Sequence, residues 1–426
     1  MKKLIFIIIS ILVASSCLFI LACKKECDDS PTISSFMFND LTPPVQGTLN
    51  NNAKTISVQV PESTDLTSLV PTITLSTACL TVSPASGVAQ NFTNEITYEV
   101  TNEAGDVANY NVTVENEEPN NTVQINWVET APMPEEIGWM PAVELNGKVY
   151  VIGGFFTNAN ITNEMFVYDP TTDIWDDTKA PMSIPRNGHT ANVVDGKIYV
   201  MGGFESASGN AVNHMEAYDP GTDTWETLST LPQNTGAHAS AVVNGKIYIM
   251  GGEPKEPPSE DITYDNVFEY DPQSDSWTEL TPMPEARCWY TASAANGKVY
   301  TFGGVNNATN LITNEIFEYN PTTDTWKEMV SMKMDRMVAG TCNIDNQIFI
   351  AAGTPSVFSL GLTVVEVFDP AENKITTGTS TSKPRLAAGV CSFDGKLIVL
   401  GGSIVGAPWD VMTDLVEAGE PVWESK

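Results

Sequence analysis

The chain of 426 residues is poor in basic side chains and has almost no histidine. Lys and Arg number 21 against 53 Asp and Glu, which gives a formal charge of −32. Nucleic acid and an anionic membrane face are excluded as expected partners, because their phosphates would be repelled. Only His189, His214 and His238 occur, and no Ser-His-Asp order, phosphate loop or zinc motif accompanies them. The charge instead fits a soluble protein in an extracytoplasmic space.

Cysteine is also sparse, with 7 residues and no C-x-x-C pair. We therefore expect no metal, no cofactor and no disulfide framework. Cys342 and Cys391 stand at one position of two neighbouring repeats, where Ala241 stands in another. This position predicts small buried side chains.

Residues 1–22 have the three-part pattern of an export signal. Lys2 and Lys3 precede the apolar run 4–21, which ends in Ala22 and Cys23. A run of this length could also form a transmembrane anchor. The ending Ile-Leu-Ala-Cys resembles the bacterial lipobox, which implies lipidation at Cys23, with Cys17 a weaker candidate. The charged residues 24–29 resemble the export tag of surface lipoproteins in some Gram-negative bacteria, which implies the outer membrane and the cell surface.

Residues 31–116, after a short lipid-anchored linker (23–30), read as a small all-β module. Apolar and polar residues alternate at 56–60 and 110–114, as in one sheet of a β-sandwich. The stretches 82–87 and 110–114 resemble bacterial Ig-like modules that follow lipid anchors. A spacer role is expected for this module. Residues 117–124, with acids and Pro119, form a linker.

From residue 125 onward the sequence repeats with a period near fifty. The stretch 146–154, Asn-Gly-Lys-Val-Tyr-Val-Ile-Gly-Gly, returns with its first closing position at 153, 202, 251, 303, 352 and 401. A typical repeat holds an apolar strand, a turn, a second strand ending in the double glycine, and a third strand ending near Tyr-Asp-Pro. The turn is Asn-Gly or Asp-Gly in five of the six repeats and Asp345-Asn346 in the fifth. A tryptophan marks the fourth strand: Trp175, Trp225, Trp277 and Trp326. Their common phase predicts packing between repeats and no cofactor stack.

Four antiparallel strands per repeat around an axis predict an all-β fold, a six-bladed β-propeller over residues 125–426. The double glycine, the Tyr-Asp-Pro and the spaced tryptophan together resemble the kelch repeat. Blade five departs, with Ala352 in place of the first glycine and no tryptophan, and blade six lacks the Asp-Pro turn. Both Trp127 and Trp423 fit the fourth-strand phase. Either residues 126–130 or residues 422–423 therefore close the ring, and we favour the N-terminal strand because it joins the first blade to the last.

All four arginines lie sixteen residues before the first position of the double glycine, on the side of the variable loops: Arg186, Arg287, Arg336 and Arg385. Two interpretations are open. The arginines form a mouth that binds a carboxylate or sulfate ligand, or each pairs with an acid of a neighbouring blade. Nearby aromatic residues add faces for stacking on a sugar, chiefly Trp139, Trp289 and Tyr290. His189 and His238 share one repeat position, which favours a role in the repeat motif over a metal site.

We expect a lipid-anchored binding module for an acidic glycan or a protein, and no enzyme. The alternative is a sugar mutarotase or epimerase resembling the kelch-type N-acetylneuraminate epimerase. That resemblance implies a carboxylate acting as general acid and base beside arginines, with Glu205, Glu253 and Glu285 as weak candidates. Kelch propellers also include the galactose oxidase type, a copper enzyme. No histidine follows residue 238, so its copper site cannot be assembled.

Overall fold

The computed structural model describes residues 30–422, apart from 43, 62–63, 117–121, 158–159, 206–208, 255–261, 307, 357–358 and 405–410. Cys17, Cys23 and the predicted export signal lie outside the described residues, as does Trp423. The chain divides into two compact units, Met1–Asn120 and Asn121–Lys426, and this boundary falls inside the predicted linker 117–124. Within the described part, no helix has the length and apolarity needed to cross a membrane.

The N-terminal unit consists of two sheets around one core. One has the order β2-β1-β5 and the other β3-β4-β8-β7-β6, with β4 and β8 parallel. The core is aromatic, and Phe36, Phe92 and Tyr98 meet edge to face. The Ig-like assignment stays a prediction. The elements are β1 (Ile33–Phe38), β2 (Val45–Gln46), β3 (Thr48–Asn50), β4 (Thr55–Val60), the 3-10 helix η1 (Leu66–Ser68), β5 (Thr72–Leu75), β6 (Thr81–Ser83), β7 (Ile96–Thr101) and β8 (Val107–Asn116).

One cysteine departs from expectation. Cys79 is disulfide-bonded, whereas Cys288, Cys342 and Cys391 are free and buried. The cysteine spacing gave no sign of this bond, and Cys79 is the one bonded cysteine among the described residues. The expectation of small buried side chains at positions 342 and 391 is confirmed, and Ala241 is buried too.

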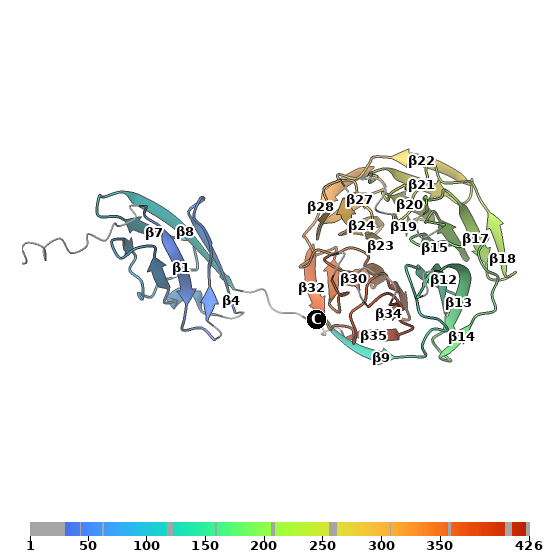
Figure 1. Cartoon of the computed structure of the whole chain (residues 1–426), viewed down its shortest axis with the longest axis horizontal. Coiled ribbons are helices and arrows are strands. Elements are labelled where there is room, and N and C mark those ends of the chain that lie inside the picture. Colours follow the sequence, from blue (N-terminus) through green and yellow to red (C-terminus); the bar gives the residue numbers. More distant parts are fainter. Residues whose placement is uncertain are drawn as a thin grey trace, which may run out of the picture. The chain divides into compact units, whose positions relative to one another are not determined.

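The second unit is a ring of six sheets, called blades 1 to 6 in chain order (Figure 1). Each has four antiparallel strands from the axis outward, and blade 1 carries a short extra strand, β10 (Ile137–Gly138). Blade 1 has β11 (Ala142–Leu145), β12 (Lys148–Phe156), β13 (Ile161–Asp169) and β14 (Ile174–Asp176). Blade 2 has β15 (Thr190–Val194), β16 (Lys197–Met201), β17 (Met215–Asp219) and β18 (Thr224–Thr227), and blade 3 has β19 (Ala239–Val243), β20 (Lys246–Met250), β21 (Val267–Asp271) and β22 (Ser276–Leu280).

The remaining blades follow the same plan. Blade 4 adds a small hairpin, β25 (Val305–Asn306) and β26 (Leu311–Ile312), between its second and third strands. Its blade strands are β23 (Thr291–Ala295), β24 (Lys298–Phe302), β27 (Ile316–Asn320) and β28 (Thr325–Glu328). Blade 5 has β29 (Gly340–Ile344), β30 (Gln347–Ala351), β31 (Val365–Asp369) and β32 (Lys374–Gly378), and blade 6 has β33 (Gly389–Phe393), β34 (Lys396–Leu400), β35 (Val416–Val422) and β9 (Gln124–Glu129).

The N-terminal strand closes the ring. β9 is the outermost strand of blade 6, and its Trp127 lies opposite Gly419 of β35 (Figure 1). The Trp127 indole N–H donates to the carbonyl of Thr379 at 2.9 Å, and Thr379 directly follows the last strand of blade 5. The preference for the N-terminal strand is therefore confirmed.

The first hairpin turn of every blade needs two residues with positive φ. Asn146 and Gly147 have φ of 52° and 78°, as a type I′ turn requires. Blade 5 has no glycine at this turn, and Asp345 and Asn346 take the same conformation at 53° and 62°. Asp and Asn tolerate this region better than other side chains, which explains the one exception.

The double glycine is required by close approach near the axis. At Gly154, φ is 107°, and a Cβ there would lie 2.7 Å from the carbonyl oxygen of Gly138. Ala352 takes only the first position of its pair, where φ is 59°. The second position of that pair remains Gly353, with φ of 91°. An alanine fits the left-handed helical region of the first position, whereas the second is open to glycine alone.

Tyrosine, aspartate and tryptophan join neighbouring blades. In blade 1, the Tyr168 hydroxyl donates to Asp173 at 2.6 Å, and Asp173 accepts the N–H of Ala131, which lies just after blade 6, at 2.8 Å. The Trp175 indole donates back to the Ala131 carbonyl at 3.1 Å and stacks on Tyr168. The same contacts recur at Trp225, Trp277 and Trp326. These tryptophans pack between blades, as predicted.

Candidate functional site: the axial cavity

Six residues at one repeat position form a closed ring of backbone hydrogen bonds around the propeller axis. Each lies in the loop that enters the first strand of its blade, and each donates its N–H to the member in the preceding blade over 2.7–3.1 Å. The bond from Trp139 to Ala387 closes the ring at 2.9 Å. All six have positive φ, between 49° and 59°. The members are Trp139, Gly188, Ala237, Trp289, Val338 and Ala387.

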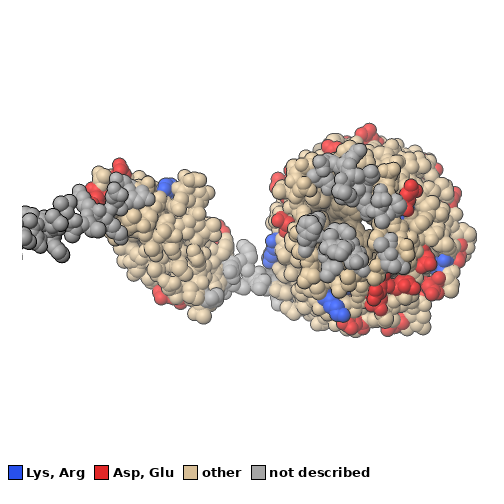
Figure 2. Space-filling model, viewed as in Figure 1, with Lys and Arg blue, Asp and Glu red and all other residues tan. Residues whose placement is uncertain are grey.

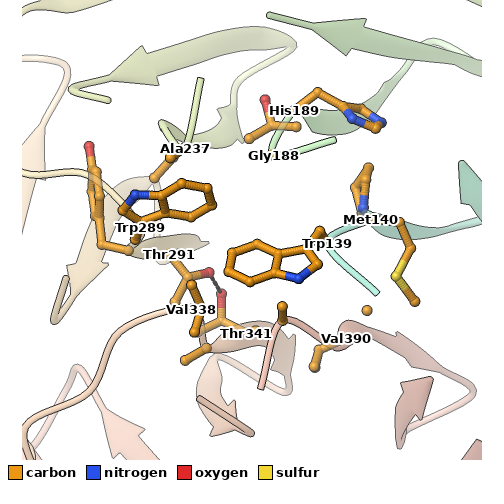
Figure 3. Close-up of a pocket in the computed structure, with 18 of the residues that line it drawn as sticks. Trp139, Met140, Gly188, His189, Ala237, Trp289, Thr291, Val338, Thr341 and Val390 are labelled. Atoms are coloured by element: carbon orange, nitrogen blue, oxygen red, sulfur yellow. Dashed lines mark hydrogen bonds between the residues drawn. The ribbon is translucent and has the colours of Figure 1, made fainter. Parts of the chain in front are cut away.

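Trp139 and Trp289 are the bulky members of this ring, and they come from opposite blades, 1 and 4. Their indoles meet edge to face with ring centroids 4.9 Å apart (Figure 3). Trp289 also stacks on Phe204, at 5.8 Å and an interplanar angle of 24°. Both indoles are half-buried. A tryptophan with positive φ is rare, and the ring forms with glycine or alanine at other members, so the fold does not require these side chains.

Beneath the ring lies a cavity of about 210 Å³. Each blade contributes its ring residue and the three that follow, such as 139–142 and 188–191. Apart from the two tryptophans and a few larger side chains, the lining consists mostly of glycine, alanine, serine, threonine and valine. A second hollow of about 340 Å³ is lined further along the same first strands, toward the hairpin turns. The axis therefore holds a narrow cavity whose variable-loop end carries two indoles.

The two buried histidines support the cavity wall. His189 donates its Nε2–H to the carbonyl of Ile152 at 3.0 Å, and His238 lies 2.9 Å from the Thr190 hydroxyl. Desolvation lowers the pKa of His238 to about 3, and the positive charge of Arg186 acts in the same direction. The pKa of His189 is also lowered by burial. Both rings are neutral, and no metal-binding group of His, Cys, Asp and Glu occurs among the described residues.

Tyr290 lines the cavity at the same repeat position as these histidines. Its hydroxyl donates to the carbonyl of Met250 at 2.6 Å, and its side chain is buried. It links two blades, and its hydroxyl is already engaged. Tyr290 therefore shapes the wall beside Trp289.

Of the two interpretations open for the four arginines, the contacts fit ion pairs and not a binding mouth. Each guanidinium is buried and pairs with a glutamate of its own blade: Arg186–Glu216, Arg287–Glu315, Arg336–Glu366 and Arg385–Glu417. A second guanidinium nitrogen donates to backbone carbonyls, as from Arg336 to Ala352 at 3.0 Å. Burial lowers the pKa of Arg186, Arg336 and Arg385. The alternative of an ion pair is correct, but the acid belongs to the same blade.

Sequence reasoning missed these glutamates, although a signal was present. In blades 2, 5 and 6 the glutamate stands two residues before the third-strand position of the Tyr-Asp-Pro motif, as in Glu216-Ala-Tyr218. In blades 1 and 3, which lack the arginine, that position is Phe166 or Phe268. The paired change of arginine and glutamate between repeats predicts the contact.

Comparisons with known proteins agree with this geometry. A family model described as KLHDC2/KLHL20/DRC7 Kelch-repeats domain matches residues 103–304, and a Kelch motif model matches residues 286–333. The second unit is a kelch-repeat propeller. The N-terminal unit matches a model described as SGBP, N-terminal, over residues 33–114.

Individual relatives of the kelch propeller are distant. The Kelch-like protein terF of Aspergillus terreus is 39% identical over 59 residues, which is 13% of each chain, so this chain spans only a small part of that relative. The solved structure described as "Structure of YjhT" has 18% identity and a TM-score of 0.57, and the match covers 67% of this chain and 95% of that one. This likeness shows the fold. A kelch propeller fold implies a binding or protein-interaction module.

The three candidate carboxylates lie apart from the axial lining of the kelch propeller. Glu205 is exposed, and Glu253 is fully buried with the Cys288 sulfur 3.7 Å from its Oε2. Glu285 lies 3.3 Å from the Nη2 of Arg287 at the variable-loop side of blade 4. The structure therefore brings together one predicted carboxylate and one predicted arginine, away from the axis.

Proposed function

We propose that the protein is an exported, lipid-anchored binding protein of the outer-membrane surface, whose kelch propeller captures a carbohydrate at the axial cavity. The export signal and Cys23, in the sequence alone, support the anchoring. The N-terminal module then serves as the spacer that carries the propeller away from the membrane.

The pair Trp139–Trp289 carries the proposal for the axial site. A bulky side chain at positive φ is strained, and four other ring members are satisfied by glycine, alanine or valine. The two tryptophans therefore stand where a smaller residue would serve the fold. Indole faces offer a large apolar surface for the C–H face of a sugar ring, with a polar N–H at the edge. The cavity of about 210 Å³ lies below the usual range for drug-sized ligands, so it fits a small group such as one sugar ring.

The charge of the protein favours a neutral ligand. The guanidiniums of the described arginines are buried and paired with glutamates, so they leave no guanidinium at the axial mouth for a carboxylate or sulfate. Acidic side chains outnumber basic ones on the propeller face in Figure 2. Selectivity for an acidic glycan is therefore not part of the proposal.

The test replaces each axial indole and measures binding of the full chain to a glycan array. Trp139→Ala and Trp289→Ala should each weaken binding about tenfold or more, whereas Trp326→Phe, which removes an indole from the outer strand of blade 4, should leave it unchanged. Thermal unfolding checks that the variants are folded. Binding that survives both axial changes would refute the axial site, and an array without any binder would favour a protein partner.

One observation favours the alternative of a sugar epimerase or mutarotase. Glu285 and Arg287 meet in blade 4, as a general acid and base beside a guanidinium would. NMR of sialic acid anomers with the full chain tests this alternative. Exchange no faster than in buffer alone would eliminate it, and faster exchange that is lost in Glu285→Gln would establish it.

A further inference from the structure

Three blades share a closed contact that consists of an arginine, a glutamate and a backbone N–H. In blade 5, Arg336 pairs with Glu366 at 2.8 Å, and the other oxygen of Glu366 accepts the N–H of Lys333 at 2.5 Å. The glutamate is fully enclosed. Blades 2 and 6 repeat this arrangement, with backbone donors from Ser183 and Ser382. In each case the donor stands three residues before the arginine.

Two blades lack all three parts of this contact. Blade 1 has Ile137 in place of the arginine and Phe166 in place of the glutamate, and blade 3 has Thr235 and Phe268. The donor position is proline in both, at Pro134 and Pro232, and proline has no N–H to give. The three positions therefore change together.

Blade 4 breaks this rule. It has the proline (Pro284) and the phenylalanine (Phe317) of the blades without arginine, yet it keeps Arg287. The guanidinium lies 4.9 Å from the centroid of the Phe317 ring and turns to two other carboxylates. These are Glu315, which pairs with Nη2, and Glu285, at 3.3 Å from the same nitrogen. Arg287 is retained although the closed contact that explains the other arginines is missing.

The carboxylates of blade 4 are accessible, unlike those of the closed contacts. The side chain of Glu315 is 33% exposed and that of Glu285 56%, against 0–1% for Glu216, Glu366 and Glu417. They face a pocket of about 340 Å³, whose other wall is the β25–β26 hairpin. Thr309, Asn306 and Leu311 of this segment line it, and Leu311 is 66% exposed. This pocket shares no lining residue with the axial cavity.

We infer that the blade 4 pocket is a binding site for neighbouring hydroxyl groups of a neutral carbohydrate. A hydroxyl both donates and accepts hydrogen bonds, so a pair of hydroxyls can donate hydrogen bonds to Glu285 and Glu315 while the threonine and asparagine groups complete the contacts. Arg287 holds the two carboxylates in place, and its buried position on Phe317 fixes that arrangement. Leu311 supplies an apolar contact for the C–H face of the ring.

The charges of the pocket disfavour anionic ligands and metal ions. Two glutamates against one arginine leave a net negative charge, which disfavours carboxylate, sulfate and phosphate ligands. The guanidinium between the carboxylates disfavours a metal ion, because it would repel a second cation. An uncharged polyhydroxyl ligand avoids both of these costs, and its hydroxyl groups match the carboxylate, threonine and asparagine groups of the pocket. The inference does not depend on the axial site, since the two sites share no residue.

The experiment uses the full chain and saturation-transfer NMR with the methyl glycosides of mannose, galactose and glucose as probes, and N-acetylneuraminic acid as the charged comparison. At least one neutral glycoside should bind, and Glu285→Ala and Glu315→Gln should each weaken that binding about tenfold, or about 1.4 kcal/mol. Glu285 is a surface side chain, so its removal does not threaten folding. Glu205→Ala, which removes an exposed glutamate from blade 2, serves as the matched control and should leave binding unchanged.

Three outcomes would overturn the inference. None of the neutral glycosides binds, or N-acetylneuraminic acid binds more tightly than all of them, or binding survives both glutamate changes. Trp139→Ala separates the two sites. If Trp139→Ala lost glycoside binding and Glu285→Ala kept it, the ligand would be assigned to the axial cavity and not to the blade 4 pocket.

Discussion

Trp139 of blade 1 donates its backbone N–H to the carbonyl of Ala387 in blade 6 at 2.9 Å. The first and last blades are thus joined at the axis, while β9 joins them at the rim through its pairing with β35. The two closures differ in kind. The inner one is a repeated backbone contact that every blade makes, whereas the outer one depends on a strand from the beginning of the repeat region.

The closing strand should contribute strongly to stability through Ile125. This side chain is buried, and it packs into the space left by Gly378 and Gly419. Ile125→Ala should lower the free energy of unfolding by about 2–5 kcal/mol, measured by urea denaturation. The control is Val128→Ala on the same strand, where the side chain is 62% exposed and the change should stay below about 0.5 kcal/mol. Equal effects of the two changes would show that β9 does not seal the propeller core.

Removing one partner of the buried ion pair Arg336–Glu366 should lower the free energy of unfolding. Replacing both partners with apolar residues should cost less. Arg336→Ile leaves Glu366 buried without its partner, which should cost about 3–5 kcal/mol of unfolding free energy. Blade 1 fills the same positions with Ile137 and Phe166, both buried. The double change Arg336→Ile with Glu366→Phe should therefore recover at least half of the loss.

A solvent-exposed pair provides the comparison for blade 5. Lys396 lies 3.4 Å from Glu420, and the two side chains are 42% and 63% exposed. Lys396→Met should change the unfolding free energy by less than about 1 kcal/mol. A double variant in blade 5 that is no more stable than the single one would contradict the role assigned to the pair.

The buried histidines should make the protein less stable as the pH falls below 6.5. The pKa of His238 is about 3 in the folded protein against 6.5 for the free side chain, so the unfolded chain takes up the proton first. Unfolding is then favoured by about 1.4 kcal/mol per pH unit for each histidine as the pH falls, and above 6.5 the effect vanishes. Urea denaturation between about pH 7.5 and 5 measures this slope.

The double variant His189→Asn with His238→Asn tests the origin of that slope. Removal of both groups should reduce the slope in this window. The aspartates with lowered pKa, such as Asp173, act at lower pH, and the remaining slope comes from His214, whose pKa burial also lowers. If the double variant kept the slope of the unchanged protein, the pH dependence would not come from burial of these two histidines in the neutral form.

The repeat period, the strand order and the hairpin turns could be predicted from sequence because they depend on neighbours in the chain. Asn146 and Gly147 favour a type I′ turn wherever they occur, and Tyr168, Asp173 and Trp175 lie within one hairpin. The kelch resemblance followed from the same local motifs.

The site could be predicted only in part. Trp139 and Trp289 were expected near the variable-loop face as neighbours of the arginine positions, but their contact joins residues 150 positions apart and depends on six blades closing into a ring. The partner of each arginine is a glutamate at the third strand of its blade. The number of residues between the two varies with the length of the loop before that strand. Arg186 and Arg385 reach glutamates 30 and 32 residues away.

The sequence by itself determined that this chain contains a ring of kelch blades preceded by a small β module, because local turn chemistry and a fixed period suffice for that. Only the tertiary structure decided which polar groups remain available for a ligand. The reason is physical: a buried charge must find a partner across the sheet, and packing determines whether it does. In blades 2, 5 and 6 the arginine is enclosed with its glutamate, whereas in blade 4 Arg287 shares two carboxylates that face an open pocket.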